Sequence, residues 1–143
     1  RPEEIIRLEA ENLAGQGLDQ VRIFERIGCS GKMISYWEAT RGHWLEWDVP
    51  VKTAGEYAIH LRYCSGAPKE PHRSLTIDGQ SPGAAFDDMG LPLTGGFCTE
   101  TDNWAYYAAG GGQTVRLEPG NHRLRMANLG EGLGLDYLLL VPR

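Results

Sequence analysis

The sequence predicts an all-β fold, and within that class an antiparallel β-sandwich or jelly roll. Apolar and polar residues alternate with a period of two in several segments, which is typical of strands that bury one face. The 19 glycines and 8 prolines divide these segments into short runs, and no stretch keeps the period of a helix. Because 143 residues suffice for one such core, we expect residues 1–143 to form a single domain.

The first predicted strand, RLEAENL, comes near the start of the chain. Residues two apart in a strand point to the same side, so Glu9 and Glu11 are expected to project together. Two longer strands follow, HWLEWDVPV and GEYAIHLRY. Their alternation predicts a buried apolar face made of Leu45, Trp47, Val49, Tyr57, Ile59, Leu61 and Tyr63.

The last third of the chain contains two further strand signals. The segment QTVRLEPGNHRLRMANL has apolar alternation on both sides of Pro119 and Gly120, which predicts a hairpin. The terminal run GLDYLLLVP is nearly all apolar, as expected of a strand in the middle of a sandwich. Residues 81–103 form a long connection, and long loops on a rigid scaffold often carry binding sites. An edge cover or a dimer contact is the alternative for this connection.

Charge and motifs exclude several classes of function. The net charge is −5 without a block of lysine and arginine, so we expect no nucleic-acid partner. The apolar terminal run is interrupted by Asp136, and we expect no membrane partner. The four histidines lie in separate segments and no catalytic motif is present, so we expect no enzyme activity. The three cysteines, Cys29, Cys64 and Cys98, permit at most one intramolecular disulfide.

An acid in the apolar terminal run requires a partner. Asp136 is costly to bury unless it is paired or binds a metal. If the first and last strands are neighbours, Glu9, Glu11 and Asp136 converge, and three carboxylates form a hard oxygen site that suits Ca²⁺. From spacing alone, ion pairs explain the acids equally well, and the candidate partners are Arg7, Arg123 and Arg125.

The chain resembles the carbohydrate-binding modules of families 6 and 35, which are galactose-binding-like β-sandwiches. The matching segments, in order, are LEAENL, GKMISYWEATRGHWLEWDVPVKTAGEYAIHLRY, LTIDG, VRLEPGNHRLRM and GLDYLLL. The resemblance implies a structural Ca²⁺ held by Glu9, Glu11 and Asp136 between the chain ends. It also implies a non-catalytic module that is extracellular or periplasmic and targets a covalently linked catalytic domain to a polysaccharide or oligosaccharide.

The resemblance also indicates which side chains contact the sugar. Two aromatic rings grip the ligand in family 6, and the matching residues are Tyr36 and Trp104, with Tyr107 as the alternative to Trp104. Sugars offer apolar faces ringed by hydroxyl groups, so rings and polar side chains are the expected contacts. Trp37 is a further candidate, and the sequence is equally consistent with a core position and a surface position for it.

One position departs from the family pattern. The asparagine that family members often carry two residues before the late aspartate is Gly134 in this chain. We expect Asp102 and Asn103 to supply polar contacts in its place, with Asn128 and Glu131 as further possibilities. The main alternative function is an accessory sandwich that packs on a catalytic domain without binding sugar.

Overall fold

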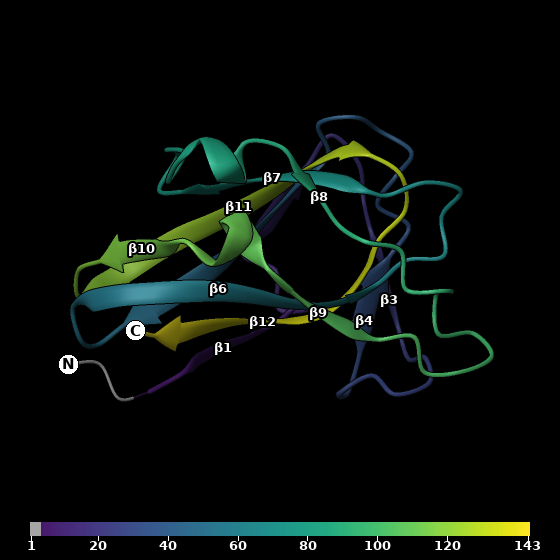
Figure 1. The fold of residues 1–143 in the computed structure, drawn as a ribbon, viewed down its shortest axis with the longest axis horizontal. Coiled ribbons are helices and arrows are strands. Elements are labelled where there is room, and N and C mark those ends of the chain that lie inside the picture. Colours follow the sequence, from purple (N-terminus) through teal and green to yellow (C-terminus); the bar gives the residue numbers. More distant parts are fainter. Residues whose placement is uncertain (1–3) are drawn as a thin grey trace.

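The computed structural model describes residues 4–143, which form two antiparallel β-sheets stacked face to face (Figure 1). The first sheet contains β1 (Ile6–Glu9), β3 (Arg22–Phe24), β4 (Met33–Ser35), β6 (Gly55–Cys64), β9 (Ala105–Ala108), β10 (Thr114–Leu117) and β12 (Gly134–Pro142). The second contains β2 (Gly15–Gly17), β5 (Trp44–Val51), β7 (His72–Ile77), β8 (Met89–Gly90) and β11 (Gly120–Gly130). Two short 3₁₀ turns, η1 (Ala84–Phe86) and η2 (Ala109–Gly112), complete the described elements. The predicted all-β sandwich is confirmed.

Strand β12 lies in the middle of the first sheet. It pairs with β6 along one edge, while β4 and β1 follow one another along the other edge. In this register Glu9 of β1 lies opposite Tyr137 of β12. The first and last strands are therefore neighbours, which is the arrangement that the resemblance implies.

The core lies between the two sheets and follows the predicted alternation. One hydrophobic cluster includes all the side chains expected on the buried face, namely Leu45, Trp47, Val49, Tyr57, Ile59, Leu61 and Tyr63. The terminal strand is also largely buried, as its apolar run predicts. Alternation located these residues because a strand with one buried face exposes every second side chain.

The predicted hairpin around Pro119 and Gly120 is wrong. Strand β10 pairs with β6 in the first sheet, whereas β11 pairs with β5 and β7 in the second. The turn therefore carries the chain from one sheet to the other. Alternation fixes which face of a strand is buried but not which strand lies beside it.

The long connection from 81 to 103 is more structured than its composition predicts. It contains η1 and β8, and its buried side chains are Phe86, Met89, Leu91 and Cys98. An isolated bridge pairs Ser65 with Gly96, so this connection is fixed to the end of β6.

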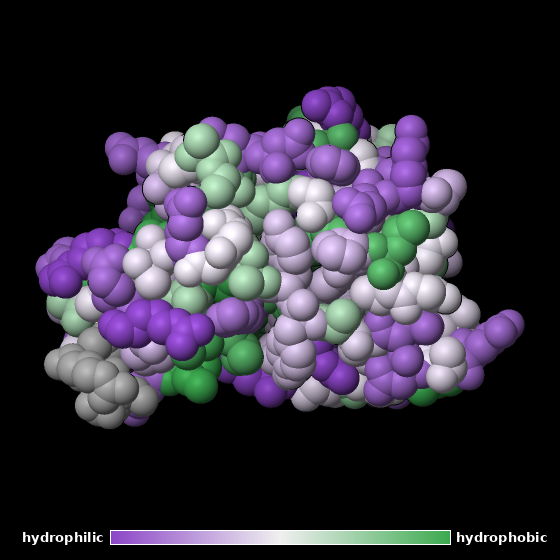
Figure 2. Space-filling model, viewed as in Figure 1, coloured by the Kyte–Doolittle hydropathy of each residue, from purple (hydrophilic) through white to green (hydrophobic). Residues whose placement is uncertain are grey.

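The loops gather at the end of the sandwich away from the two chain termini (Figure 1). We call this the loop end, and its segments are residues 25–32, 36–43, 65–71, 91–104 and 131–133. Figure 2 shows hydrophobic residues scattered among hydrophilic ones over the face in view. No helix in the described part of the chain is long and apolar enough to cross a membrane.

Candidate carbohydrate site at the loop end

Tyr36 is the most prominent ring of the loop end. It directly follows β4, its side chain is 46% exposed, and its φ of 62° is in the left-handed region. A bulky residue adopts that conformation only where its surroundings enforce it, and such residues cluster at functional sites. The Arg22 guanidinium lies 4.4 Å from the Tyr36 ring centroid, and the Phe24 ring lies 5.9 Å away. The left-handed turn therefore presents Tyr36 on the surface beside β3.

Trp37 is not a surface ring, so its prediction as a ligand contact is wrong. Its side chain is 0% exposed, and its indole N–H donates to the carbonyl of His43 at 2.9 Å. The Arg73 guanidinium lies 4.3 Å from its ring centroid. The turn at Tyr36 sends neighbouring side chains in opposite directions, so Trp37 enters the core.

Trp104 lies half-buried at the start of β9. Its indole N–H donates to the carbonyl of Ile27 at 2.9 Å, which attaches Trp104 to the 25–32 loop. The Asp102 carboxylate accepts a hydrogen bond from the Trp104 backbone N–H at 3.0 Å. The Arg62 guanidinium lies 5.4 Å from the Trp104 ring centroid. These contacts hold Trp104 in a fixed orientation beside the 25–32 loop.

The other predicted contacts have different surroundings. The Tyr107 ring packs edge-on against Tyr63, with centroids 6.3 Å apart, and belongs to the margin of the core. The structure therefore does not support Tyr107 as the alternative to Trp104. The Asn103 side-chain oxygen accepts a hydrogen bond from the Cys98 backbone N–H at 3.0 Å, so this oxygen stabilises the 91–104 loop. Asp102 remains exposed at the loop end.

Sequence reasoning missed Phe24 and Phe97. The Arg26 guanidinium lies 4.4 Å from the Phe24 ring centroid and donates to the carbonyl of Phe97 at 2.9 Å. A Cβ placed on Gly132 would lie 3.1 Å from the Phe97 ring, so Phe97 also lies against the 131–133 loop. The only sequence signal for Phe97 is an aromatic residue inside a glycine-rich loop.

A hollow of about 480 Å³ is lined by residues of the 25–32 loop and the 91–104 loop. Its lining residues are Glu25, Arg26, Ile27, Cys98 and Thr99. The lining therefore combines a cation, a carboxylate and a hydroxyl group with apolar atoms. Trp104 and Phe97 lie directly next to these residues. This is the chemistry that a sugar requires, namely apolar surface with polar groups at its rim.

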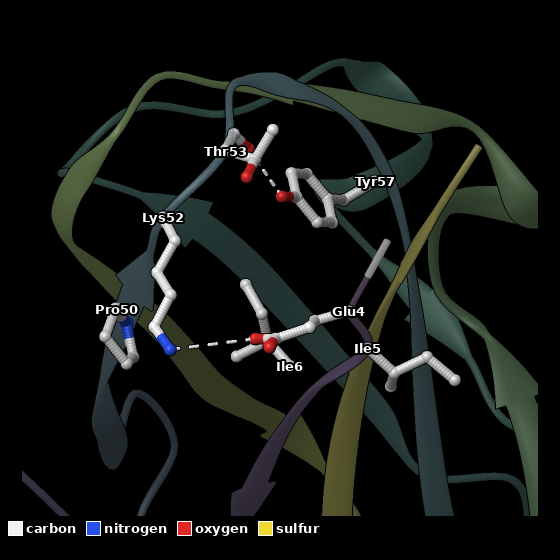
Figure 3. Close-up of a pocket in the computed structure, with 7 residues that line it drawn as sticks. All are labelled: Glu4, Ile5, Ile6, Pro50, Lys52, Thr53 and Tyr57. Carbon is white, nitrogen blue, oxygen red and sulfur yellow. Dashed lines mark hydrogen bonds and ion pairs between the residues drawn. The ribbon is translucent and has the colours of Figure 1, made fainter. Parts of the chain in front are cut away.

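A second hollow, of about 390 Å³, lies at the opposite end of the sandwich (Figure 3). Its one aromatic lining residue, Tyr57, is 2% exposed and donates its hydroxyl to the carbonyl of Thr53 at 2.6 Å. Lys52 and Glu4 face each other across it, 3.8 Å apart. Tyr57 presents no free ring face, so this hollow offers no aromatic surface on which a ligand could stack. A third, about 460 Å³, is lined by Lys69, Glu70, His72, Leu129, Gly130 and Glu131.

Gly134 has a structural reason to depart from the family pattern. A Cβ at this position would lie 2.8 Å from the Cys64 sulfur and 2.9 Å from the terminal methyl of Met33. An asparagine does not fit without displacing these two side chains. Of the residues expected to compensate, Asn128 is buried and donates to the carbonyls of Glu38 and Thr40.

Asp136 lies at the point where the first and last strands meet. It occupies a bulge of β12 and is 0% exposed. Its carboxylate accepts hydrogen bonds from the Ser30 backbone N–H at 3.0 Å and from Arg62 Nη1 at 2.5 Å. Its backbone carbonyl accepts from the N–H of Ala10. Of the expected ion-pair partners, Arg7 binds Glu9, whereas Arg62, which the sequence did not single out, binds Asp136.

Glu11 is the one acid in the described part of the chain with a buried, unpartnered carboxylate oxygen. Burial raises the pKa of Glu11, and the nearby charges of Glu9 and Asp136 raise it further. These oxygen donors suit Ca²⁺ chemically. Within residues 4–143, however, no group of three or more His, Cys, Asp or Glu side chains is arranged to hold a metal ion.

Neither family models nor curated proteins match the chain. Among solved structures, a family 35 carbohydrate-binding module from Clostridium thermocellum is 21% identical and superposes with a TM-score of 0.77, covering 99% of this chain and 100% of that one. A family 6 module of Cellvibrio mixtus lichenase 5A, solved with cellotriose, is 22% identical with a TM-score of 0.66, covering 96% of each chain. The chain has the fold of these modules.

The same fold also occurs as part of a larger protein. In the GH26–CBM35 β-(1,4)-mannanase of Podospora anserina, the match covers 97% of this chain but 28% of the other, at 16% identity and a TM-score of 0.71. Identities this low establish a shared carbohydrate-binding-module fold, and function has to be argued from the site itself.

Proposed function

We propose that this carbohydrate-binding-module fold binds a polysaccharide or oligosaccharide at its loop end without catalysing a reaction. The observation that carries the proposal is the exposed Tyr36 ring, held in a left-handed conformation at the same end as Trp104 and the polar hollow. Aromatic rings pack on the apolar faces of sugars, and Arg26 and Thr99, which line the hollow, would hydrogen-bond hydroxyl groups at its rim.

Binding of this kind is weak at a single site. An open surface with few polar anchors gives dissociation constants of roughly the micromolar to millimolar range. A covalently attached catalytic domain benefits even so, because tethering raises its local concentration at the polysaccharide. Attachment to such a domain and an extracellular or periplasmic location are parts of this proposal.

The test is affinity electrophoresis with soluble polysaccharides, followed by calorimetry on any that retard the protein. We expect retardation by at least one glycan, and loss of retardation in Tyr36→Ala and Trp104→Ala. The matched controls are Tyr36→Phe and Trp104→Phe, which keep a ring and should keep most of the affinity. Circular dichroism has to show that each variant remains folded.

The outcomes separate the two candidate functions. Retardation that survives both alanine changes would move the binding site away from the loop end. No retardation by any glycan would favour the accessory sandwich that packs on a catalytic domain. Release of sugar from a glycan by the pure protein would contradict both candidates.

We also propose a structural Ca²⁺ at Glu9, Glu11 and Asp136. The support is the unpartnered Glu11 oxygen and the pKa of Glu11, which burial raises and the charges of Glu9 and Asp136 raise further. The ion would supply positive charge to these acids and so link the chain ends, in competition with Arg7 and Arg62, which pair with two of them.

Calcium that binds only the folded state raises stability by about 2.7 kcal/mol at a hundredfold excess over its dissociation constant. We therefore expect EDTA to lower the melting temperature, and added Ca²⁺ to restore it. The Glu11→Gln variant should lose most of this response. Equal melting temperatures in EDTA and in excess Ca²⁺ would refute the calcium site and leave the sugar proposal untouched.

A further inference from the structure

The three cysteines lie in different environments. Cys64 ends β6 and Cys98 belongs to the 91–104 loop, and both are 0% exposed. Cys29 is half-buried in the 25–32 loop, where its thiol donates to the carbonyl of Gly31 at 3.1 Å. All three sulfurs are free thiols in this structure. Three disulfide pairings are possible among these cysteines, and the sequence alone does not favour any of them.

The backbone brings the segments around Cys64 and Cys98 together. Ser65 pairs with Gly96 as an antiparallel bridge, and the Thr94 backbone N–H donates to the carbonyl of Ser65 at 2.9 Å. The Ser65 N–H donates in return to the Thr94 hydroxyl at 2.9 Å. These contacts fix the end of β6 against the 91–104 loop independently of the sulfur atoms.

Both cysteines lie next to this junction, Cys64 before Ser65 and Cys98 after Gly96. Burial raises the pKa of the Cys64 thiol, and the nearby Cys98 thiol raises it further, so the two side chains lie close together. The Cys98 backbone is in the left-handed region, with a φ of 60°. Its sulfur accepts a hydrogen bond from the Asn103 N–H at 3.3 Å, and its carbonyl accepts one from the Ile27 N–H at 3.2 Å. Cys98 is therefore held in place by contacts from both sides of the hollow at the loop end.

We propose that Cys64 and Cys98 are the pair that forms a disulfide when the chain folds in an oxidising environment, with Cys29 left as a thiol. The bond joins β6 to the loop that carries Trp104. The antiparallel bridge between Ser65 and Gly96 brings the two backbone segments together beside these cysteines, and a disulfide requires such a close approach of the two backbones. The proposal holds whether or not the loop end binds sugar.

The reaction is an ordinary thiol–disulfide exchange. One cysteine thiolate attacks glutathione disulfide and releases one glutathione, and the second cysteine then displaces the other glutathione from the mixed disulfide. The two cysteines together lose two protons and two electrons, and two molecules of glutathione are produced. Burial raises the pKa of the Cys64 thiol, so the nucleophilic thiolate is scarce in the folded protein. The bond should therefore form during folding, before the loop closes over the sulfurs.

The experiment is peptide mapping after refolding. The reduced, denatured chain is refolded with glutathione disulfide and glutathione, and free thiols are then alkylated under denaturing conditions. We expect one alkylated cysteine, Cys29, and a cross-linked peptide pair that contains Cys64 and Cys98. Adding the same glutathione mixture to protein that is already folded and reduced should form the bond much more slowly.

Serine variants provide the matched controls. Cys29→Ser should retain the cross-link, and Cys64→Ser and Cys98→Ser should lose it. If either of the last two fails to fold, the map of the unmodified chain still decides the question. Alkylation of all three cysteines in the refolded chain, or a cross-link that includes Cys29, would overturn the proposal.

Discussion

Replacing Arg73 with methionine tests how the loop end is held together. Arg73 is 0% exposed, and its guanidinium donates four hydrogen bonds of 2.8–3.1 Å to backbone carbonyls. The four acceptors are His72, Trp37, Gly130 and Glu131. Burial lowers the pKa of Arg73 to about 9, so the side chain is still charged at neutral pH. One buried cation thus links the 36–43 and 131–133 loops to β7.

The expected loss follows from these contacts. A hydrogen bond from a charged donor contributes about 1.5–3 kcal/mol, so the four together contribute roughly 6–12 kcal/mol. Removing the side chain also removes the cost of burying a charge without a carboxylate partner, which is several kcal/mol. We therefore expect Arg73→Met to lower the free energy of unfolding by about 3 kcal/mol, or the melting temperature by roughly 6–12 °C.

The assay is urea unfolding followed by tryptophan fluorescence and circular dichroism. The matched control is Arg116→Met, because Arg116 is exposed and its only described carboxylate partner is Glu118 on the surface. We expect the control to unfold at nearly the same urea concentration as the parent. An Arg73→Met variant with the parent's midpoint and slope would refute the reasoning, because the four carbonyls would then not depend on the guanidinium.

Three further predictions concern other parts of the fold. In EDTA, Arg62→Met should lower the free energy of unfolding by about 3–5 kcal/mol, because it leaves Asp136 buried without its cation. Adding Asp136→Asn to this variant should recover part of the loss. An Arg62→Met variant as stable as the parent in urea unfolding would contradict this prediction. Burial lowers the pKa of His43 below its ordinary 6.5. As the pH falls below 6.5, the imidazole is therefore protonated more readily in the unfolded chain than in the folded one, and the free energy of unfolding should decrease. A His43→Asn variant should lose less stability on acidification, and equal losses in urea titrations would argue against this role. Gly134→Asn should cost about 1–3 kcal/mol through crowding against Cys64, and a gain in glycan affinity without a loss of stability would show the opposite.

Local pattern determined the strands and their buried faces. In β6, apolar residues alternate with polar ones, and the side chains from Tyr57 to Tyr63 that alternation assigns to the core are indeed buried. These predictions hold because the period of a strand is a property of the chain itself. The pairing of β1 with β12 was implied by the resemblance to families 6 and 35, in which acids near the two chain ends share a calcium ion.

Tertiary structure alone decided which side chains the loop end exposes. Tyr36 and Trp37 are adjacent aromatic residues, and one is exposed while the other is buried because the backbone turns into the left-handed region between strands. Asp136 likewise takes its partner from β6, through Arg62, rather than from the arginines that the sequence made candidates. Alternation does not extend into a loop, and an ion pair between distant strands exists only once the sheet has fixed which strands are neighbours.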